Sequence, residues 1–540
     1  MKEISSTGSF INFYLNNYIY VDKTQYIIDL IKLERVFISR PRRFGKSLTL
    51  DTIATLFETG VEPYFKGTWI YDKWTEPTYP VLRLNFLDLD KYSLEHFKQK
   101  LNAIISSFAR DINVKNYEEK VEPEDTIYFL LDELRKEKRQ IVILIDEYDC
   151  QMTANINNET LYKQFQEKIK SFYATIKNKW PIKFLGITGV TRLKDVEIFS
   201  IGSDINDITN ESAFSQLIGF TRDEIKKYYI DYLNLAASCE NKCRVEEVTD
   251  TQIESMLDMM AQNYDGYCFD EFYRQKVFST WSVNSFFQSI VENKFVFFDE
   301  YWYDNGGLPS ILVNYLKTHE LNIFEYLDKD KFLKVSSDDF KNPTALTTIN
   351  QNVLMCQTGY LTLRSDLKKS STVLLAIPNG EIYKALNRLL ANNIFKGKAD
   401  VTDDQGKNLL EEGTVDDIIN LFNSALNSVS YDNYPIVSES SVQNMLKLYL
   451  LGAHQEVLSE VHEAKGRADL IVNTDIRRIV FEFKYAQNES EAKTKLSEAV
   501  EQIKSRDYGN ILPKKRELLR IAAVFNADPK VRAFTQYKAV

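Results

Sequence analysis

The sequence predicts an α/β protein whose N-terminal part is built on a parallel β-sheet, and three observations support this prediction. Strand-like and helix-like segments alternate over residues 1–215, the pattern produced by β-α-β connections. The aliphatic run from Ile141 to Ile145 suits a strand that is buried on both faces. Near the C-terminus, two short strand-like segments at 466–472 and 477–484 indicate a second sheet.

The alternation predicts the N-terminal elements one by one. We expect strands at 18–21, 36–39, 80–86, 141–146 and 182–187, and helices at 25–33, 93–109, 125–138 and 161–178. Further along, Thr221 and Glu224 form a capping-box pattern, so a helix should begin near Arg222. More helices are expected at 251–264 and 282–292, with core packing for the nearby aromatic residues Tyr264, Tyr267, Phe269, Trp281, Phe286 and Phe287.

Composition places the chain among globular proteins. Its 540 residues are enough for about three domains. Hydrophobic residues make up 44% and charged residues 27% of the chain, and the aromatic content of 13% argues against extended disorder. The formal net charge of −10 gives no overall basic field, so any contact with nucleic acid must be local.

Cysteine usage and hydropathy predict a protein that stays in the cytoplasm. The five cysteines form no framework, and we interpret them as reduced thiols. Cys239 and Cys243 have a ligand-like spacing, but no second pair accompanies them, so a zinc site is not expected. No apolar run approaches the roughly eighteen residues of a membrane span, and the first residues lack a signal-peptide core, so no membrane partner is expected.

The segment Gly45-Lys46-Ser47 lies where a predicted strand meets a predicted helix. At such a junction, backbone N–H groups and the helix dipole can hold a phosphate. Gly45 would let the backbone approach the phosphates, Lys46 would reach the terminal phosphates, and the Ser47 hydroxyl would coordinate Mg²⁺. Arg40 stands where the G-x-x-x-x-G-K-[ST] motif has its first glycine, although Pro41 favours extended geometry there. The alternative is a basic surface turn without a ligand.

Two acids follow the aliphatic run that ends at Ile145. Ligands of parallel sheets bind at the carboxyl ends of the strands, so Asp146 and Glu147 should emerge beside the phosphate-binding turn. Asp146 could hold the Mg²⁺ shell, and Glu147 could orient or deprotonate an attacking water. The alternative is a buried strand followed by a solvated acidic turn.

The C-terminal strands carry a second set of charged residues. Period-two alternation places Glu482 and Lys484 on one face of their strand, and Asp469 comes within reach if the two strands pair. Clustered carboxylates bind Mg²⁺, and a lysine beside them can position or deprotonate a water. The alternative is an ordinary cross-strand charge pattern.

Together these motifs resemble the AAA-ATPase-like proteins that carry a C-terminal PD-(D/E)XK nuclease domain. The segments that carry the resemblance are 20–24, 39–48, 144–149, 264–267, 281–284, 357–361 and 466–469, which span nearly the whole chain. The resemblance implies a P-loop core of the AAA or ASCE type, in which the Arg-Pro-Arg-Arg-Phe-Gly-Lys-Ser loop is the usual form. It also implies the division 1–215 ATPase domain, 216–320 helical lid, 321–395 winged-helix-like or connecting α+β unit, and 396–540 nuclease-like domain.

The third of these parts has two open interpretations. Strands expected at 354–363 and 372–377, around the turn with Lys368 and Lys369, resemble the wing of a winged-helix module. A hairpin that merely joins two domains is the alternative. A helix should follow at 380–390, and residues 400–407 are the best linker candidate.

The resemblance also assigns site residues. Arg43, Thr188 and Arg192 join the turn as nucleotide-binding residues: Thr188 matches a sensor of the γ-phosphate, and Arg192 could reach a phosphate or a neighbouring domain. For both, an ordinary turn at the end of a strand remains open. In the nuclease part, Asp469, Glu482 and Lys484 match the Asp…Glu-x-Lys core. Glu460 matches an extra acid of the superfamily, and Gln502 a frequent accessory glutamine.

These assignments predict an ATP-binding and ATP-hydrolysing switch joined to a Mg²⁺-dependent phosphodiesterase that cleaves nucleic acid, with DNA as the expected target. The alternative is a nucleotide-regulated module that binds nucleic acid or protein without cleavage. A third hypothesis is a nuclease whose ATPase part is catalytically silent, which is motivated by Arg40 at the position of the motif's first glycine. Assembly into a homo-oligomer is left open.

Overall fold

The computed structural model describes residues 1–177, 179–193, 204–302, 310–316, 319, 322–343, 345–395, 403–453, 455–463, 466–506 and 516–540. The chain forms two compact units. The first contains Met1–His319 and Asp330–Ile382, and the second contains Glu320–Lys329 and Tyr383–Val540. The four-part division at residues 215, 320 and 395 stays a prediction.

A five-stranded parallel sheet forms the centre of the first unit. Its strands are β1 (Arg35–Ser39), β2 (Val81–Asn85), β3 (Ile141–Asp146), β4 (Ile182–Gly189) and β5 (Asn206–Asp207). They lie in the order β2-β3-β4-β1-β5, and every neighbouring pair is parallel, which confirms the predicted α/β fold. The strand expected at 18–21 is wrong, because this segment has no strand pairing.

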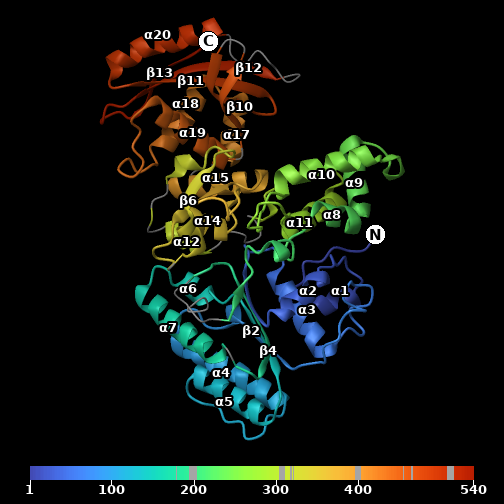
Figure 1. Ribbon diagram of the computed structural model, residues 1–540. Coiled ribbons are helices and arrows are strands. Elements are labelled where there is room, and N and C mark those ends of the chain that lie inside the picture. The colour runs from blue at the N-terminus through green and yellow to red at the C-terminus, as the bar shows by residue number, and fades with distance from the viewer. Residues whose placement is uncertain are drawn as a thin grey trace. The chain divides into compact units, whose positions relative to one another are not determined.

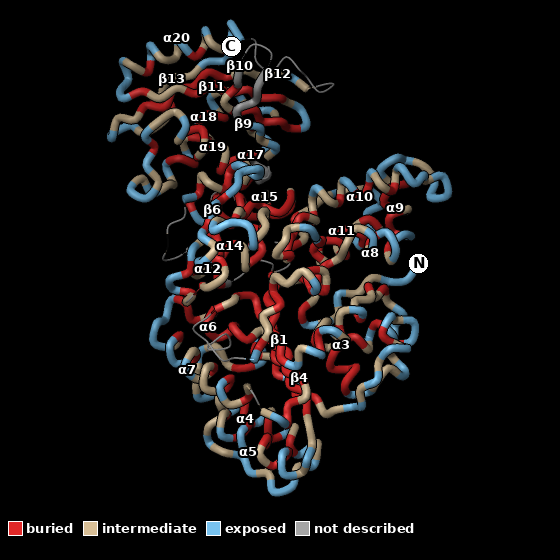
Figure 2. Tube along the Cα trace, in the orientation of Figure 1, coloured by how far each residue is buried: buried red, intermediate tan, exposed pale blue. Residues whose placement is uncertain are grey.

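Helices cover both faces of this sheet (Figure 1). They are α1 (Phe10–Leu15), α2 (Ile27–Lys32), α3 (Lys46–Thr59), α4 (Leu94–Asp111), α5 (Pro123–Lys136), α6 (Cys150–Ala154) and α7 (Glu159–Ile176). In Figure 1, α1–α3 lie to one side of the sheet and α4–α7 to the other. Strands β1 and β4 are therefore buried along their length, as Figure 2 shows, and their aliphatic side chains form the core.

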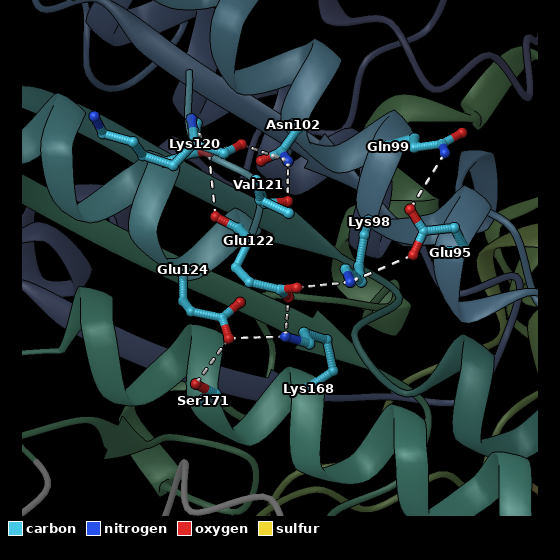
Figure 3. Close-up of polar contacts among 11 residues, drawn as sticks. Glu95, Lys98, Gln99, Asn102, Lys120, Val121, Glu122, Glu124, Lys168 and Ser171 are labelled. Atoms are coloured by element: carbon cyan, nitrogen blue, oxygen red, sulfur yellow. Dashed lines mark hydrogen bonds and ion pairs between the residues drawn. The ribbon is translucent and has the colours of Figure 1, made fainter. Parts of the chain in front are cut away.

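A network of ion pairs joins α4, α5 and α7 (Figure 3). The carboxylate of Glu122, the residue before α5, accepts from Lys98 Nζ at 2.7 Å and from Lys168 Nζ at 2.5 Å. Lys168 also reaches Glu124 at 2.8 Å. The hydrogen bonds from Lys168 and Lys98 lower the pKa of Glu122, so the carboxylate stays charged and links the three helices.

A helical part follows the sheet. Thr221 and Glu224 form the predicted capping box at the start of α8 (Arg222–Tyr228), which precedes α9 (Ile230–Asn241), α10 (Asp250–Tyr264) and α11 (Thr280–Asn293). Tyr264, Tyr267, Phe286 and Phe287 are buried, as predicted. Phe269 and Trp281 are only partly buried, and each instead lies under an arginine guanidinium of the β1–α3 loop.

The last part of the first unit contains a small antiparallel sheet in the order β6-β8-β7. Its strands are β6 (Leu333–Ser336), β7 (Thr362–Leu363) and β8 (Thr372–Ala376), and its helices are α12 (Ser310–Leu316), α13 (Ser337–Lys341), α14 (Gln351–Gln357) and the start of α15 (Gly380–Ile394). Strand β8 is confirmed. Of the strand expected at 354–363, only β7 at its end is a strand, and residues 354–357 belong to α14. The Asn350 side chain caps a helix there, and Gly359, at φ +95°, follows it.

The second unit contains a five-stranded mixed sheet in the order β13-β12-β11-β10-β9. Its elements are α17 (Asp403–Glu412), α18 (Val415–Leu426), α19 (Glu439–Gly452), β9 (Glu456–Glu463), β10 (Gly466–Asn473), β11 (Arg477–Ala486), α20 (Glu489–Arg506), β12 (Glu517–Asn526) and β13 (Ala533–Ala539). Helix α20 covers one face, where Ile503 packs in one cluster with Val480, and α18 covers the other, where Phe422 meets Phe481 (Figure 1).

The predicted linker at 400–407 is wrong for residues 403–407, which form the first turns of α17, and residues 400–402 lie outside the described residues. Its cluster of Asp and Gln residues supports the start of a helix as readily as a loop, because acids favour a first helical turn. Within the described part of the chain, no helix combines the length and the apolar character that crossing a membrane requires.

Candidate functional site

The loop between β1 and α3 has the backbone of an anion-binding turn. Gly45 adopts φ +103°, which glycine tolerates without steric cost, and Arg43 also lies in the left-handed region, at φ +69°. Helix α3 begins at Lys46, so its first N–H groups face this turn. The turn lines a cavity of about 660 Å³, together with the start of the chain and residues of α11.

Lys46 is buried in the loop, with 4% of its side chain exposed. Its Nζ donates to the carbonyl oxygens of Arg40 at 3.0 Å and Pro41 at 3.1 Å. It also lies 3.4 Å from Oε1 of Glu147, the acid that follows β3. The ammonium group therefore faces oxygen acceptors at the edge of the cavity, where a phosphate oxygen would make the same kind of contact.

Three predicted residues meet at the carboxyl ends of β3 and β4. The Ser47 hydroxyl donates to Oδ2 of Asp146 at 2.5 Å, and the Thr188 hydroxyl donates to Oδ1 of the same carboxylate. Adjacent parallel strands end at the same edge of the sheet, so Asp146 and Thr188 are held side by side. A hydroxyl beside a carboxylate is a donor set that suits a hard cation such as Mg²⁺.

Glu147 lines the same cavity. Burial raises its pKa, the charge of Lys46 opposes this rise, and the carboxylates of Asp149 and Asp146 add to it. Its backbone is in the left-handed region, at φ +54°, so the chain turns sharply after Asp146. A carboxyl with a raised pKa at the edge of a cavity has the chemistry expected of a general base.

Arg40 explains how the loop departs from the glycine motif. Arg40 is 1% exposed and is not among the residues that line the cavity, and its guanidinium donates to the carbonyl oxygens of Ser39 at 2.9 Å and Thr209 at 2.6 Å. It also lies over the Phe269 ring, 4.0 Å from the centroid. Burial lowers the pKa of Arg40 to about 9. The side chain thus anchors the loop to the Thr209 and Phe269 segments.

The two other predicted arginines are placed differently. Arg43 lies with its guanidinium 3.9 Å from the centroid of Trp281 and lines the cavity. Arg192 is not brought to this cavity: its Nε forms an ion pair with Asp207 on β5, and its backbone exchanges hydrogen bonds with the Gln357 side chain. Of the nucleotide-binding residues predicted from sequence, Arg192 is therefore separated from the others.

In the second unit, Asp469 and Glu482 meet where two strands part. The pairing of β10 with β11 runs from Asn473 opposite Arg478 to Leu470 opposite Phe481. Beyond this point, Oδ2 of Asp469 accepts the Phe483 N–H at 2.8 Å. Asp469 thus bonds to the residue that follows Glu482, and its charge acts on the Glu482 carboxyl.

The Glu482 carboxyl is fully buried. Its Oε1 accepts from Lys484 Nζ at 2.8 Å, whereas its buried Oε2 has no hydrogen-bond partner among the described residues. Burial, followed by the charge of Asp469, raises its pKa to about 7. A buried carboxylate oxygen without a donor, next to a second carboxylate, fits a divalent cation, which would compensate both charges.

Lys484 joins the two carboxylates to a residue that the sequence patterns missed. Its Nζ lies 3.2 Å from Oε1 of Glu439, the first residue of α19. Burial lowers the pKa of Lys484, but the hydrogen bond and charge of Glu482, then the charges of Glu439 and Asp469, reverse this effect and raise it. Gln443, one turn along α19, donates to the Asp469 carbonyl. Glu439 lies on a helix and outside the Asp…Glu-x-Lys pattern, so no periodicity in the sequence marks it.

The remaining predicted residues are less well placed. Glu460 belongs to β9, but its side chain lies outside the described residues. Gln502 is partly buried on α20, next to Ile503, which packs on the Val480 face of the sheet. The described residues contain no group of three or more His, Cys, Asp or Glu side chains placed around one point. A cation here would thus take ligands from Asp469, Glu482, water and substrate, as Mg²⁺ commonly does.

Two segments of the chain match known families. Residues 5–199 match a model described as a predicted AAA-ATPase, and residues 437–534 match one described as the PD-(D/E)XK nuclease superfamily. A curated relative, an uncharacterized protein in the vnfD 5' region of Azotobacter chroococcum mcd 1, is 26% identical over 532 residues, which cover 95% of this chain and 94% of that protein. Among solved structures, Cdc6p from Pyrobaculum aerophilum matches with 12% identity and a TM-score of 0.25, over 72% of this chain and 99% of that one.

Proposed function

Because residues 5–199 belong to the AAA-ATPase-like family and residues 437–534 to the PD-(D/E)XK nuclease superfamily, we propose that this chain is an ATP-driven switch joined to a Mg²⁺-dependent nuclease that cleaves DNA. The observation that carries the proposal is the pair of assembled sites. Ser47, Asp146 and Thr188 meet beside the phosphate-binding turn, and Asp469, Glu482 and Lys484 meet where β10 and β11 part.

In the ATPase half, each side chain has a role that follows from its position. Lys46 binds the terminal phosphates, because its ammonium already faces oxygen acceptors at the cavity edge. Ser47 and Asp146 hold Mg²⁺, and Thr188, bonded to the same carboxylate, senses the γ-phosphate. Glu147 orients the attacking water and takes its proton. Arg40 keeps the loop in place, so the missing glycine does not argue against nucleotide binding.

In the nuclease half, Asp469 and Glu482 hold a divalent cation, which polarises the scissile phosphate when it is bound. Lys484 stabilises the extra negative charge that develops on the phosphate during attack by water. Glu439 holds the Lys484 ammonium beside the carboxylates. The chain as a whole is acidic, but the exposed basic residues Lys493, Lys504 and Arg506 on α20 supply local phosphate contacts.

Nucleotide binding is tested with a fluorescent ATP analogue and Mg²⁺ on the full chain. Wild type should bind it, and Lys46→Ala should lose binding, because the principal cation at the phosphates is removed. Lys32→Ala is the matched control, since this lysine is exposed and its ion pair with Asp29 is exposed too, so the pair contributes little to stability. Equal binding by wild type and Lys46→Ala would remove the ATPase half of the proposal.

Cleavage is tested on plasmid and single-stranded DNA with Mg²⁺ or Mn²⁺. Wild type should cut, and Asp469→Ala and Lys484→Ala should not, whereas Asp475→Ala, an exposed acid in the turn between β10 and β11, should retain activity. If no DNA is cut with either metal, the C-terminal half is a binding module and the nuclease proposal fails.

A further inference from the structure

A buried tryptophan holds the backbone of the phosphate-binding loop. Trp302 is fully buried, and its indole Nε1 donates to the Arg42 carbonyl oxygen at 3.1 Å. Its ring meets Tyr360 edge-on, with 5.3 Å between the centroids. Arg42 lies four residues before Lys46, so a change in the loop backbone alters the geometry of this hydrogen bond.

The backbone of Trp302 is held in turn by a buried carboxyl. The Trp302 N–H donates to Oε1 of Glu381 at 2.8 Å, and the hydroxyl of Ser282 on α11 donates to Oε2 at 2.7 Å. Glu381 is 2% exposed. Burial raises its pKa to about 8, and the hydrogen bonds from Trp302 and Ser282 oppose this rise. The carboxyl therefore depends on both donors, and loss of either leaves a buried acceptor unpaired.

The next residue of the loop is held by the same helix that carries Ser282. The Thr280 hydroxyl donates to the Arg43 carbonyl oxygen at 2.9 Å, and Trp281 lies under the Arg43 guanidinium. The carbonyl oxygens of Arg42 and Arg43 thus accept hydrogen bonds from Trp302 and Thr280. Both donors are connected to Glu381: Trp302 bonds to it directly, and Thr280 lies on the helix whose Ser282 bonds to it.

Glu381 is the second residue of α15, and this helix has residues in both units of the chain. Gly380–Ile382 belong to the first unit, and the rest of α15, from Tyr383 to Ile394, belongs to the second. Helix formation is cooperative, so a change in the stability of the first turn alters the stability of the turns that follow it. Glu381, which bonds to the tryptophan that holds the loop, thus lies at the first turn of a helix. The rest of this helix belongs to the second unit.

We propose that Trp302 and Glu381 are positioning residues that tie the phosphate-binding loop to α15, so that nucleotide bound at the loop changes the stability of this helix. The inference rests on the proposed function, because it needs nucleotide to bind at Lys46. It adds to that function a physical route by which the ATPase half regulates the second unit.

The test is hydrogen–deuterium exchange on the full chain, with and without a non-hydrolysable ATP analogue and Mg²⁺. In wild type, the analogue should slow exchange in peptides of the loop, 40–50, and change exchange in peptides of α15, 383–394, by about twofold or more. In Trp302→Phe, which keeps the ring and loses the donor to Arg42, the loop should still be protected, whereas the response of α15 should be lost. Glu381→Gln should weaken the same response.

The matched control is Trp74→Phe, because the buried indole nitrogen of Trp74 has no hydrogen-bond partner among the described residues. This variant should keep the full response of α15. A general loss of stability would change exchange equally with and without nucleotide, so the nucleotide-dependent difference is the diagnostic readout. An unchanged α15 response in Trp302→Phe, or none in wild type despite loop protection, overturns the link. Absence of loop protection in wild type overturns the proposed function itself, and the link with it.

Discussion

Arg40 shows how one residue can depart from a motif and still support it. The glycine that the motif expects would give the loop conformational freedom, whereas Arg40 fixes the loop by donating to main-chain oxygens of Ser39 and Thr209. The sequence indicated extended geometry at this position through Pro41, but not the burial of the guanidinium. Burial depends on the Thr209 and Phe269 segments, which reach Arg40 only in the folded chain.

Restoring the glycine is therefore expected to harm the protein. Arg40→Gly should lower the free energy of unfolding by about 3 kcal/mol, because buried carbonyl oxygens lose their donor and a cavity forms under Phe269. Urea-induced unfolding of the full chain measures this difference. A variant as stable as wild type that also binds nucleotide more tightly would mean that Arg40 is a defect in the loop.

Glu439 is the residue of the candidate site that sequence patterns did not identify. It is one of 77 acidic residues, it lies outside the Asp…Glu-x-Lys pattern, and only the fold brings it to Lys484. Glu482 and Lys484 could be selected from sequence because strand alternation fixes their common face, and Asp469 because the two strands were expected to pair and the three residues match the Asp…Glu-x-Lys core. A contact between the start of a helix and a strand has no such periodicity to reveal it.

The Glu439 contact makes a specific prediction. Glu439→Ala should reduce metal-dependent cleavage about tenfold, because the Lys484 ammonium loses a partner that holds it in place. Stability should change by less than about 1 kcal/mol, since this carboxylate is 43% exposed. Cleavage rates and thermal unfolding of the same preparations measure both quantities. Glu498→Ala, which removes an exposed acid paired with Lys495 on α20, is the control and should leave both unchanged; equal rates for the two variants would contradict the assignment.

At the scale of elements, α4, α5 and α7 depend on the charge of Glu122. The hydrogen bonds from Lys168 and Lys98 lower its pKa in the folded chain below its value in the unfolded chain, about 4.3. Its contribution to stability is therefore present above that unfolded value and is lost as the pH falls through the lower folded value.

Glu122→Gln should accordingly lower the free energy of unfolding by about 1 kcal/mol at pH 7, and the gap between the two proteins should close as the pH falls below about 4. Denaturant unfolding at pH 7, 5 and 3.5 follows the gap. Glu118→Gln, an exposed acid paired with Lys120, should match wild type at each pH. A gap that is constant with pH would show that the loss is one of packing and not of charge.

Element predictions succeeded where several signals agreed. Strand β3 has a long aliphatic run, and α8 has a complete capping box at Thr221 and Glu224. The error at 354–363 arose because Val353-Leu354-Met355 is a short apolar run, which periodicity alone cannot assign to strand or helix. Asn350 is a residue that favours the start of a helix, and in the structure its side chain accepts the Asn352 N–H at the start of α14.

At the scale of the whole molecule, each of the two units contains one candidate site, and the two candidate sites differ in their chemistry. Family patterns predicted the order of these sites along the sequence, and the structure agrees with a parallel-sheet unit followed by a mixed-sheet unit. The proposed link from the loop to α15 was not predictable, because Arg42, Trp302 and Glu381 are far apart in sequence and no motif named in the sequence analysis contains Trp302 or Glu381. The hydrogen bonds that form this link can be identified only from the folded structure, where the buried donors and acceptors are paired.

The most direct test of the central claim is plasmid cleavage by the full chain with Mg²⁺, with and without ATP, for wild type, Lys46→Ala and Asp469→Ala. We expect ATP to change the cleavage rate of wild type, Lys46→Ala to cut at a rate insensitive to ATP, and Asp469→Ala not to cut. Cleavage that survives in Asp469→Ala, or an ATP effect that persists in Lys46→Ala, would contradict the claim.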